Sequence, residues 1–344
     1  MRTPFIPERL LVTGSTGAVG RAIATVAASW RAPVRLLTHR APVPPSVVAA
    51  LPGAELRSGD LAHPETLRGI ADGCDVVVHA ATRGGFAPLD QERRRQVNVG
   101  GTEALLREAT GAGVKTFVLV GYTGTIQERE RRDVAVDEET PPEGEYEIDT
   151  VRHKMEAEAL VLEANGTGGL RAMVVSPGVA LAPDADTLLG GLIRVYRDGD
   201  LPYRVLDEVW LALSDARDLP RFVAAAIERG QGGRRYFATS DCVRLGDLYR
   251  RLHALSGIEP PRRRLPDLLV EELGLLTPVL PPHSYLRRLV LPREMVLHLR
   301  RLAPLTNART QTELGVAPTP LETTLRDVLG AREGEGEGRG RAAG

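Results

Sequence analysis

Lysine is almost absent from this chain of 344 residues. Only Lys115 and Lys154 occur, so nearly all of the 44 basic residues are arginine. An ammonium group is compact and its pKa falls readily on burial, whereas a guanidinium stays protonated and planar. A lysine kept in an arginine-rich chain therefore deserves a specific explanation. Lys154 stands in the helical stretch DTVRHKMEAE (149–158), and we expect it to have a functional role rather than to be one exposed helix charge.

Cysteine, long apolar runs and net charge are also scarce. Two cysteines, Cys74 and Cys242, form no disulfide framework and fit a reducing cytoplasm. No apolar run approaches the roughly 20 residues of a membrane-spanning helix, and the first residues do not resemble a signal peptide. A net charge of -1 gives no field that attracts nucleic acid or anionic lipid. We therefore expect a cytoplasmic protein that acts on a small molecule without nucleic acid, membrane or metal.

Short β-branched runs alternate with helical stretches in the first half of the chain. This alternation predicts an α/β fold of the Rossmann type, a doubly wound parallel sheet covered by helices on both faces. Residues 1–177 form the predicted nucleotide-binding domain, 178–330 mostly a smaller mixed substrate-binding region, and 331–344 a disordered tail. The predicted strands are 9–14, 33–39, 54–60, 75–82, 115–125, 169–178 and, in the second half, 233–240; the predicted helices are 18–30, 97–113 and 150–165.

A glycine-rich stretch, VTGSTGAVGRAI, lies between the first strand and the first helix. Gly14 permits a tight turn, Gly17 lets the backbone approach a pyrophosphate, and Gly20 lets the helix pack closely on the sheet. The helix N-terminus presents free N–H groups and a partial positive charge to the phosphates. Because the stretch follows a strand and opens a helix, we expect it to bind a dinucleotide.

Acidic residues are missing where an NAD-binding protein needs one. An acidic side chain about 20 residues after the loop usually binds the adenosine ribose of NAD. Here no Asp or Glu occurs between Glu8 and Glu55, and the second strand ends instead in His39 and Arg40. An arginine there meets a 2′-phosphate with a planar fork. We favour NADP(H) over NAD(H), with a merely solvent-exposed Arg40 as the alternative.

These motifs resemble the extended short-chain dehydrogenase/reductases, close to the NAD-dependent epimerase/dehydratase family and its dihydroflavonol-reductase-like branch. TGSTGAVG is similar to that family's TGxxGxxG loop, SGDL and HAAT to its third- and fourth-strand ends, and VNVGGTEALLREATGAG to its helix with Asn98. SPGVALAP resembles the RPGxVYGP segment, with Ser176 where arginine is usual. The resemblance implies a dinucleotide cofactor, a possible homodimer and these cofactor-binding residues: Gly14, Ser15, Thr16, Gly17, Val19, Gly20, His39, Arg40, Asp60, Leu61, Ala80, Ala81 and Lys154.

The catalytic groups of this family are a Ser or Thr after the fifth strand and a Tyr-x-x-x-Lys pair on the next helix. The resemblance assigns Thr123 to the hydroxyl and Lys154 to the lysine, and it puts Thr150 at the tyrosine position. In the family the lysine binds the nicotinamide ribose and lowers the pKa of the phenol. An aliphatic hydroxyl is too weak an acid for that exchange, so Thr150 is expected to hydrogen-bond or to position a water.

The proton donor is therefore open. The candidates are Tyr122 at the end of the fifth strand, Tyr146 in a Glu- and Pro-rich loop, and Lys154 acting alone or through water. We expect His79, in the fourth strand, to be packed there.

Two functions fit these residues. The first is an NADP(H)-dependent oxidoreductase or epimerase-like enzyme that acts on a small carbonyl or hydroxyl substrate. The second is a regulatory or accessory protein that binds the dinucleotide without ordinary catalysis. A non-redox lyase or dehydratase in the same pocket lies between them.

Overall fold

A parallel sheet forms the centre of the molecule and confirms the predicted fold class. The computed structural model describes residues 7–27, 32–40, 42–84, 90–143, 148–183, 187–280 and 290–330. Within them the sheet has the order β3-β2-β1-β4-β5-β6-β9, and every neighbouring pair is parallel. Its strands are β1 (Leu10–Thr13), β2 (Val34–Thr38), β3 (Glu55–Ser58), β4 (Val76–His79), β5 (Thr116–Val120), β6 (Arg171–Pro177) and β9 (Arg235–Ala238).

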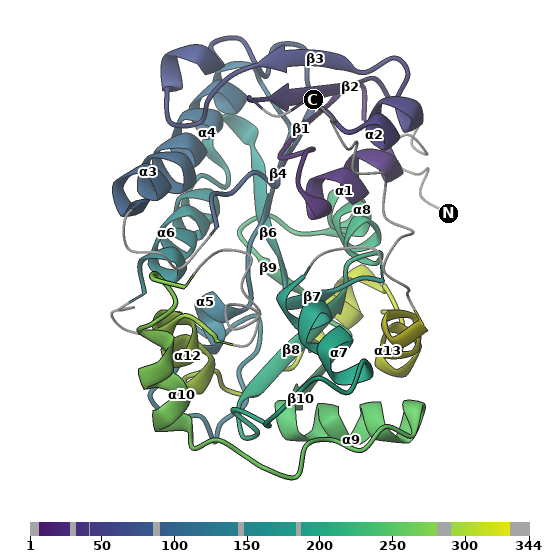
Figure 1. Ribbon diagram of the computed structural model, residues 1–344. Coiled ribbons are helices and arrows are strands. Elements are labelled where there is room, and N and C mark those ends of the chain that lie inside the picture. The colour runs from purple at the N-terminus through teal and green to yellow at the C-terminus, as the bar shows by residue number, and fades with distance from the viewer. Residues whose placement is uncertain are drawn as a thin grey trace, which may run out of the picture.

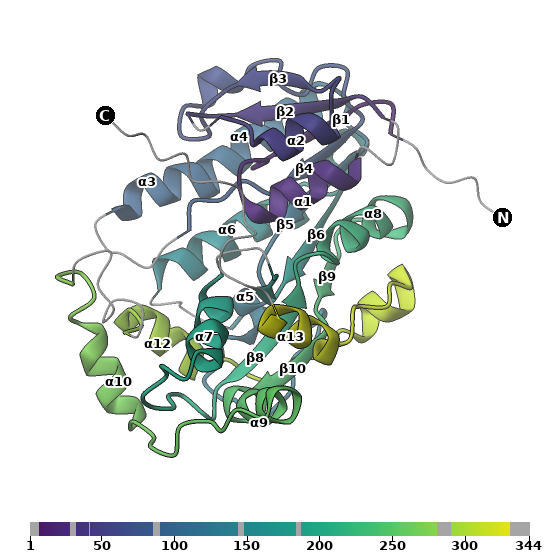
Figure 2. The same cartoon turned by 45° about the vertical axis from the view of Figure 1, so that its right-hand side comes forward.

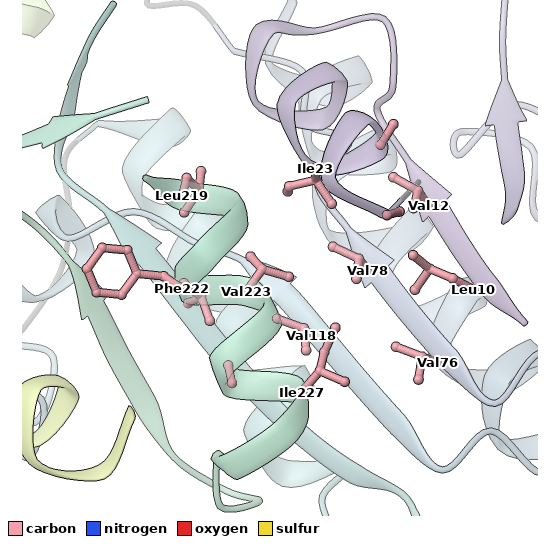
Figure 3. Packing of buried hydrophobic residues seen from close by; sticks show 14 of the residues in the cluster. Leu10, Val12, Ile23, Val76, Val78, Val118, Leu219, Phe222, Val223 and Ile227 are labelled. Atoms are coloured by element: carbon pink, nitrogen blue, oxygen red, sulfur yellow. The ribbon is translucent and has the colours of Figure 1, made fainter. Parts of the chain in front are cut away.

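Helices cover both faces of this sheet (Figures 1 and 2). On one face α1 (Ala18–Ala27) and α8 (Leu219–Arg229) pack on alternate strand residues, as Figure 3 shows for Ile23 and Val223 beside Val78 and Val118. On the other face α4 (Gly101–Gly111) and α6 (Asp149–Glu163) bury Leu105 against the same strands. Removing two such faces from water is the main contribution to the stability of the sheet.

A second, three-stranded sheet lies beyond the carboxyl ends of the main strands (Figure 1). Its strands are β7 (Val179–Leu181), β8 (Trp210–Asp215) and β10 (Asp241–Arg244), with β8 parallel to β7 and antiparallel to β10. The helices packed into its core are α7 (Leu188–Arg197), α9 (Leu245–Ser256), α10 (Asp267–Gly274), α12 (Arg293–Arg300) and α13 (Leu321–Gly330). Between β8 and β10 of this second sheet, the chain returns to the main sheet through α8 and β9.

Two predicted elements differ from the structure. The fifth strand ends at Val120 rather than at 125, and helix α5 (Gly124–Gln127) follows. The chain turns there because the Thr123 N–H binds the Pro177 carbonyl, 3.0 Å away, and the next residues close a helical turn. The helix expected over 97–113 begins earlier, as α3 (Gln91–Arg95), and runs through a π-helical segment, η4 (Gln96–Gly100), into α4. The remaining helices are short: α2 (Pro45–Ala50), η2 (Pro64–Leu67), η5 (Thr167–Gly169) and η6 (Thr310–Leu314). The predicted tail, 331–344, lies outside the described residues.

Candidate functional site

The glycine loop adopts the tight geometry expected of it at two positions. Gly14 has a φ of +78°, and a Cβ there would lie 2.6 Å from the backbone nitrogen of Ala81. A Cβ on Gly20 would lie 2.1 Å from the carbonyl oxygen of Gly14. Gly17 is exposed, and a Cβ on it would meet only the Gly14 oxygen, at an ordinary 3.5 Å. The chain itself therefore requires glycine at 14 and 20, but its own packing leaves room for a side chain at 17.

The loop contains two hydroxyl side chains, Ser15 and Thr16, just before α1. The hydroxyl of Ser15 is buried and has no hydrogen-bond partner among the described residues. Thr16 is exposed, and Val19 is half-buried against the core. A buried hydroxyl without a partner costs free energy unless a ligand satisfies it, and a helix N-terminus attracts anions. The loop therefore fits a phosphate-bearing group.

An acidic and basic cluster lies at the ends of β2 and β3. The Asp60 carboxylate lies 3.2 Å from His39 Nε2 and 2.7 Å from Arg93 Nη2, and it accepts the Ala62 N–H at 2.9 Å. Burial acts to raise the pKa of Asp60, but the Ala62 N–H and the charges of His39 and Arg93 outweigh it and hold that pKa below its usual value. Arg40 is exposed at the end of β2, whereas the neighbouring His39 is engaged with Asp60.

Arg93 is not among the candidate residues named from the sequence, and it lies in a run of three arginines, 93–95, of a kind that is usually solvated. The structure shows that the run is helical, so its members differ in environment: Arg93 pairs with Asp60, Arg94 is buried, and Arg95 is exposed. A helical period separates these three faces but does not indicate which of them meets Asp60. Leu61, next to Asp60, is buried against Gly101, where a Cβ would lie 2.6 Å from the Leu61 Cβ.

His79 is packed in the fourth strand, as expected. Its Nδ1 lies 2.7 Å from Thr13 Oγ1 and its Nε2 lies 3.0 Å from Thr102 Oγ1. Burial, with a smaller contribution from the charge of Lys154, lowers the pKa of His79 to about 4, so the ring is neutral at neutral pH. Thr13 also accepts the Ala81 N–H at 3.1 Å, which fixes the end of β4 beside the glycine loop. Ala80 and Ala81 are half-buried there.

Asn98, in the π-helical segment, holds the chain that follows β4. Its Oδ1 accepts the Arg83 N–H at 2.7 Å and the Thr82 hydroxyl at 3.2 Å, and its Nδ2 donates to the Arg83 carbonyl at 3.1 Å. The Lys154 ammonium donates to Thr82 Oγ1 at 3.3 Å. Lys154 is therefore brought to the carboxyl edge of the sheet, where ligands of doubly wound folds bind.

The environment of Lys154 makes its ammonium easy to neutralise. Burial lowers the pKa of Lys154 to about 8, although the carboxylate of Glu158 opposes this shift. Glu158 is itself buried, accepts the Thr125 hydroxyl at 3.0 Å and is paired with Arg235. Since these partners already satisfy Glu158, the lysine charge is only partly compensated. Thr150 is buried on α6 one turn before Lys154.

Two hydroxyl groups follow β5. The Thr123 side chain is fully buried, and its Oγ1 has no hydrogen-bond partner among the described residues. Tyr122 is half-buried, and its hydroxyl lies 3.0 Å from Nε2 of His298, which the sequence did not single out. Burial and the Glu128 carboxylate raise the pKa of Tyr122 well above its usual value. His298 is far from Tyr122 in the chain and carries no local motif, so nothing in the sequence pointed to it. Tyr146 lies outside the described residues.

Neither a metal site nor a membrane span emerges from the part of the chain that the structure describes. No three His, Cys, Asp or Glu side chains in these ranges group closely enough to hold a metal ion. No helix in them is both long and apolar enough to cross a bilayer.

Comparisons with known proteins agree with this geometry. The model of the NAD dependent epimerase/dehydratase family matches residues 10–238. The sterol demethylase protein B of Methylococcus capsulatus is 28% identical over 93% of this chain and 96% of its own length. The 4-hydroxy-2-methyl-3-oxo-4-farnesyl-3,4-dihydroquinoline-1-oxide ketoreductase of Stigmatella aurantiaca is 31% identical over 67% of this chain and 68% of its own.

A solved structure extends the likeness to the whole fold. The crystal structure of gox2253 superposes with a TM-score of 0.75 at 28% identity, and the match covers 94% of this chain and 97% of that one. The family match includes the glycine loop, the end of β4, Thr123 and Lys154. The chain therefore belongs to the NAD dependent epimerase/dehydratase family of extended short-chain dehydrogenase/reductases.

Proposed function

We propose that this protein is an NADP(H)-dependent oxidoreductase that interconverts a carbonyl and a hydroxyl group. The observation that carries the proposal is the position of Lys154: its ammonium is bonded to Thr82 at the end of β4, and the backbone of Ala80 and Ala81 in the same strand end abuts Gly14 of the glycine loop. The glycine loop and Lys154 of α6 thus lie at the same edge of the sheet.

The glycine loop holds the pyrophosphate in this proposal. Ser15 and the first N–H groups of α1 would bind its oxygens, and the bare Gly17 would let it approach. Ala80 and Ala81 would line the path of the cofactor toward the nicotinamide, with Asp60 and Leu61 beside the adenine. The arrangement is supported by the buried, unpartnered Ser15 hydroxyl and by the open space at Gly17.

The preference for NADP(H) rests on charge at the end of β2. Arg40 is exposed there, and no acidic residue occurs between Glu8 and Glu55 to bind a free ribose hydroxyl pair. Asp60, which would repel a 2′-phosphate, is already neutralised by Arg93. A guanidinium meets a phosphate with two parallel hydrogen bonds, so Arg40 is the residue assigned to it.

Lys154 and Thr123 are the groups assigned to the reacting end. When bound, the reduced cofactor supplies a hydride to the carbonyl carbon. Lys154 would hold the nicotinamide ribose and orient the ring, and Thr123 would donate its hydroxyl proton to the substrate oxygen as a hydrogen bond. The buried Thr123 hydroxyl lacks any partner in the described residues, which leaves it free for a ligand. Thr150 is assigned to the binding of a water or of the substrate. Tyr122 is assigned the role of proton donor, which in the family belongs to the tyrosine of the Tyr-x-x-x-Lys pair.

The names of the relatives support an apolar substrate. One contains a sterol and the other a farnesyl group on a quinoline ring, and both of these are large apolar skeletons. We infer that this protein acts on a ketone or secondary alcohol carried by such a skeleton. The described parts of 178–330, apart from α8 and β9, are assigned to the substrate pocket because the second sheet and its helices lie beyond the carboxyl ends of the main strands (Figure 1).

Calorimetry and turnover with Lys154→Met test the proposal. Wild-type protein should bind NADPH more tightly than NADH and should oxidise NADPH with a saturated ketosteroid or a long-chain methyl ketone. Lys154→Met should bind NADPH more weakly and lose turnover by roughly 10²-fold or more. Thermal melting controls for folding, and Lys115→Met is the matched control because the Lys115 side chain is exposed and pairs with the exposed Glu8. Equal turnover in wild type and Lys154→Met would contradict the proposal.

A second function is favoured by Thr150. An aliphatic hydroxyl at the tyrosine position fits a protein that binds NADPH as a signal and does not consume it. This alternative predicts tight NADPH binding with no oxidation of NADPH by ketones, aldehydes or nucleotide sugars, and robust turnover of any of these would exclude it. A non-redox elimination in the same pocket would appear as product formed without any change in NADPH absorbance.

A further inference from the structure

A chain of three side chains, two of them buried, continues from the end of β5 into the C-terminal half of the protein. The Tyr122 hydroxyl lies 3.0 Å from His298 Nε2, and His298 Nδ1 lies 2.7 Å from Glu128 Oε2. His298 is 1% exposed and Glu128 is 4% exposed. A buried histidine between a phenol and a carboxylate has the connectivity of a hydroxyl–imidazole–carboxylate relay.

Two backbone hydrogen bonds hold the segment after α5 against the segment after α12, and so fix the contact between Tyr122 and His298. The Arg129 N–H binds the Arg301 carbonyl at 2.9 Å, and the Ala303 N–H binds the Gln127 carbonyl at 2.8 Å. The segment that follows α12 is thereby pinned to the end of α5, as the neighbouring positions of these helices in Figures 1 and 2 also show. His298 is therefore held at a set distance from Tyr122 although 176 residues separate them.

Gly124 makes room for the pair. A Cβ at this position would lie 2.1 Å from Cε1 of Tyr122 and 2.8 Å from Nε2 of His298. Any larger residue would force the phenol and the imidazole apart. The bare backbone at 124 is thus a requirement of this contact, independent of the hydrogen bonds themselves.

The carboxylate of Glu128 determines which nitrogen of His298 donates a hydrogen bond and which one accepts. Ionised Glu128 only accepts, so His298 Nδ1 donates to it, and neutral His298 then accepts the Tyr122 O–H at Nε2. Once His298 gains a proton, Nε2 donates to the Tyr122 oxygen instead. The phenol proton is then free to point away from the imidazole.

We propose that His298, oriented by Glu128, is a positioning and proton-relay residue that makes Tyr122 the proton donor of this site. The inference rests on the oxidoreductase function proposed above. As the hydride adds to the carbonyl carbon, the carbonyl π pair moves to oxygen and the Tyr122 O–H bond breaks to protonate it. The phenolate takes the Nε2 proton of His298, and the neutral imidazole regains a proton from water when product leaves. The cofactor is oxidised by two electrons and the carbonyl carbon is reduced.

The charged groups around His298 come from three elements. Glu128 faces Nδ1, and Arg301 Nη1 lies 3.5 Å from the second oxygen of Glu128. On α10, Glu271 is paired with Arg293 and Arg300 of α12 itself. Glu271 already pairs with two arginines, whereas Glu128 accepts the hydrogen bond of His298 Nδ1. Glu128 is therefore the carboxylate that orients His298.

Steady-state kinetics of three variants test the relay, with NADPH and a saturated ketosteroid or a long-chain methyl ketone as probes. Tyr122→Phe should lower kcat by roughly 10²–10⁴-fold. His298→Gln keeps a polar side chain but cannot titrate, so it should lower kcat by roughly tenfold or more, leave KM and NADPH affinity within about twofold, and remove one ionisation from the pH dependence of kcat. Glu128→Gln should lower kcat in the same way. His253→Gln, on the half-exposed surface of α9, is the matched histidine control and should leave the pH profile unchanged.

The double variant separates a relay from a structural contact. Because the groups act as a unit, Tyr122→Phe/His298→Gln should be no slower than Tyr122→Phe alone. Multiplied losses in the double variant, or a wild-type pH profile in His298→Gln, would overturn the relay and leave the oxidoreductase function standing, provided that Lys154→Met is inactive. If wild-type protein fails to oxidise NADPH with either probe, the oxidoreductase function and the relay both fall. Thermal melting and NADPH binding of each variant show that a loss of rate is not a loss of fold.

Discussion

Two glycines of the loop, Gly17 and Gly20, should respond in opposite ways to the same added methyl group. A Cβ on Gly20 would lie 2.1 Å from the Gly14 carbonyl oxygen and 2.4 Å from its carbon. Both of these are backbone atoms, so α1 would have to move away from the loop. A Cβ on Gly17 would touch only that oxygen at 3.5 Å, and the backbone there has no positive φ. Gly20 is therefore constrained by the packing of the chain, and Gly17 is not.

The geometry sets the expected magnitudes. Overpacking against a backbone that cannot relax costs about 1–3 kcal/mol, so Gly20→Ala should be destabilised by that amount. Gly17→Ala should change the free energy of unfolding by less than about 0.5 kcal/mol, because the methyl group faces solvent. In the bound state, however, that methyl group would take the space of the pyrophosphate. Losing one charge-assisted hydrogen bond at about 1.5–3 kcal/mol corresponds to roughly a 10–150-fold weaker binding of NADPH.

Urea unfolding and NADPH calorimetry on the two variants check this expectation. Gly17→Ala should unfold at the same urea concentration as the wild-type protein and bind NADPH poorly. Gly20→Ala should unfold at a lower urea concentration than the wild-type protein. If Gly17→Ala bound NADPH with wild-type affinity, the loop would not be the phosphate site. If it lost as much stability as Gly20→Ala, the glycine at 17 would be explained by packing alone, and the inference drawn from its open space would fail.

Three further predictions follow from single side chains. Arg40→Ala should weaken NADPH binding roughly tenfold or more while leaving NADH binding unchanged, and a parallel loss for both coenzymes would contradict the 2′-phosphate assignment. Since the pKa of Lys154 is about 8, NADPH affinity should fall as pH rises through about 8, and Lys154→Arg, which stays protonated, should not show this fall. The pKa of His79 is lowered to about 4 from 6.5, so the unfolded state binds the extra proton and stability should drop by up to ~3 kcal/mol between pH 6.5 and 4. His79→Gln should flatten that part of the urea-unfolding profile, and an unchanged pH dependence would refute the assignment.

The parts of the fold that the sequence predicted are those set by short-range patterns. Buried strands such as Leu10–Thr13 and Val76–His79 each begin with three apolar residues, and the turn at Gly14 needs a residue tolerant of positive φ. Such features depend on neighbours within a few positions. The β5 boundary was wrong because the chain leaves the sheet through a bond from Thr123 to Pro177, and that bond depends on the sixth strand.

The parts of the site that the sequence missed join distant segments. Arg93 reaches Asp60 across 33 positions, and His298 reaches Glu128 across 170. Neither pair has a spacing that a helix or strand period reveals. Arginine is so common in this chain that one more carries no signal, and a lone histidine in a C-terminal helix is more often packed than functional. The candidate residues of the loop and of α6 could be named in advance, whereas Arg93 and His298 could not.

The position of the phenol bears on the direction of reaction. In the family the phenol stands one helical turn from the lysine, whose charge favours the ionised form and allows the group to act as a base. Tyr122 has the reverse environment, because burial and the Glu128 carboxylate both favour its neutral form. A neutral phenol can donate a proton to an oxygen that gains negative charge, but it must first lose that proton to accept one from an alcohol. His298 is the neighbour able to take it, and this transfer is the reverse of the relay step proposed for reduction. With Tyr122 as the donor, carbonyl reduction therefore starts from protonated His298, whereas alcohol oxidation starts from neutral His298.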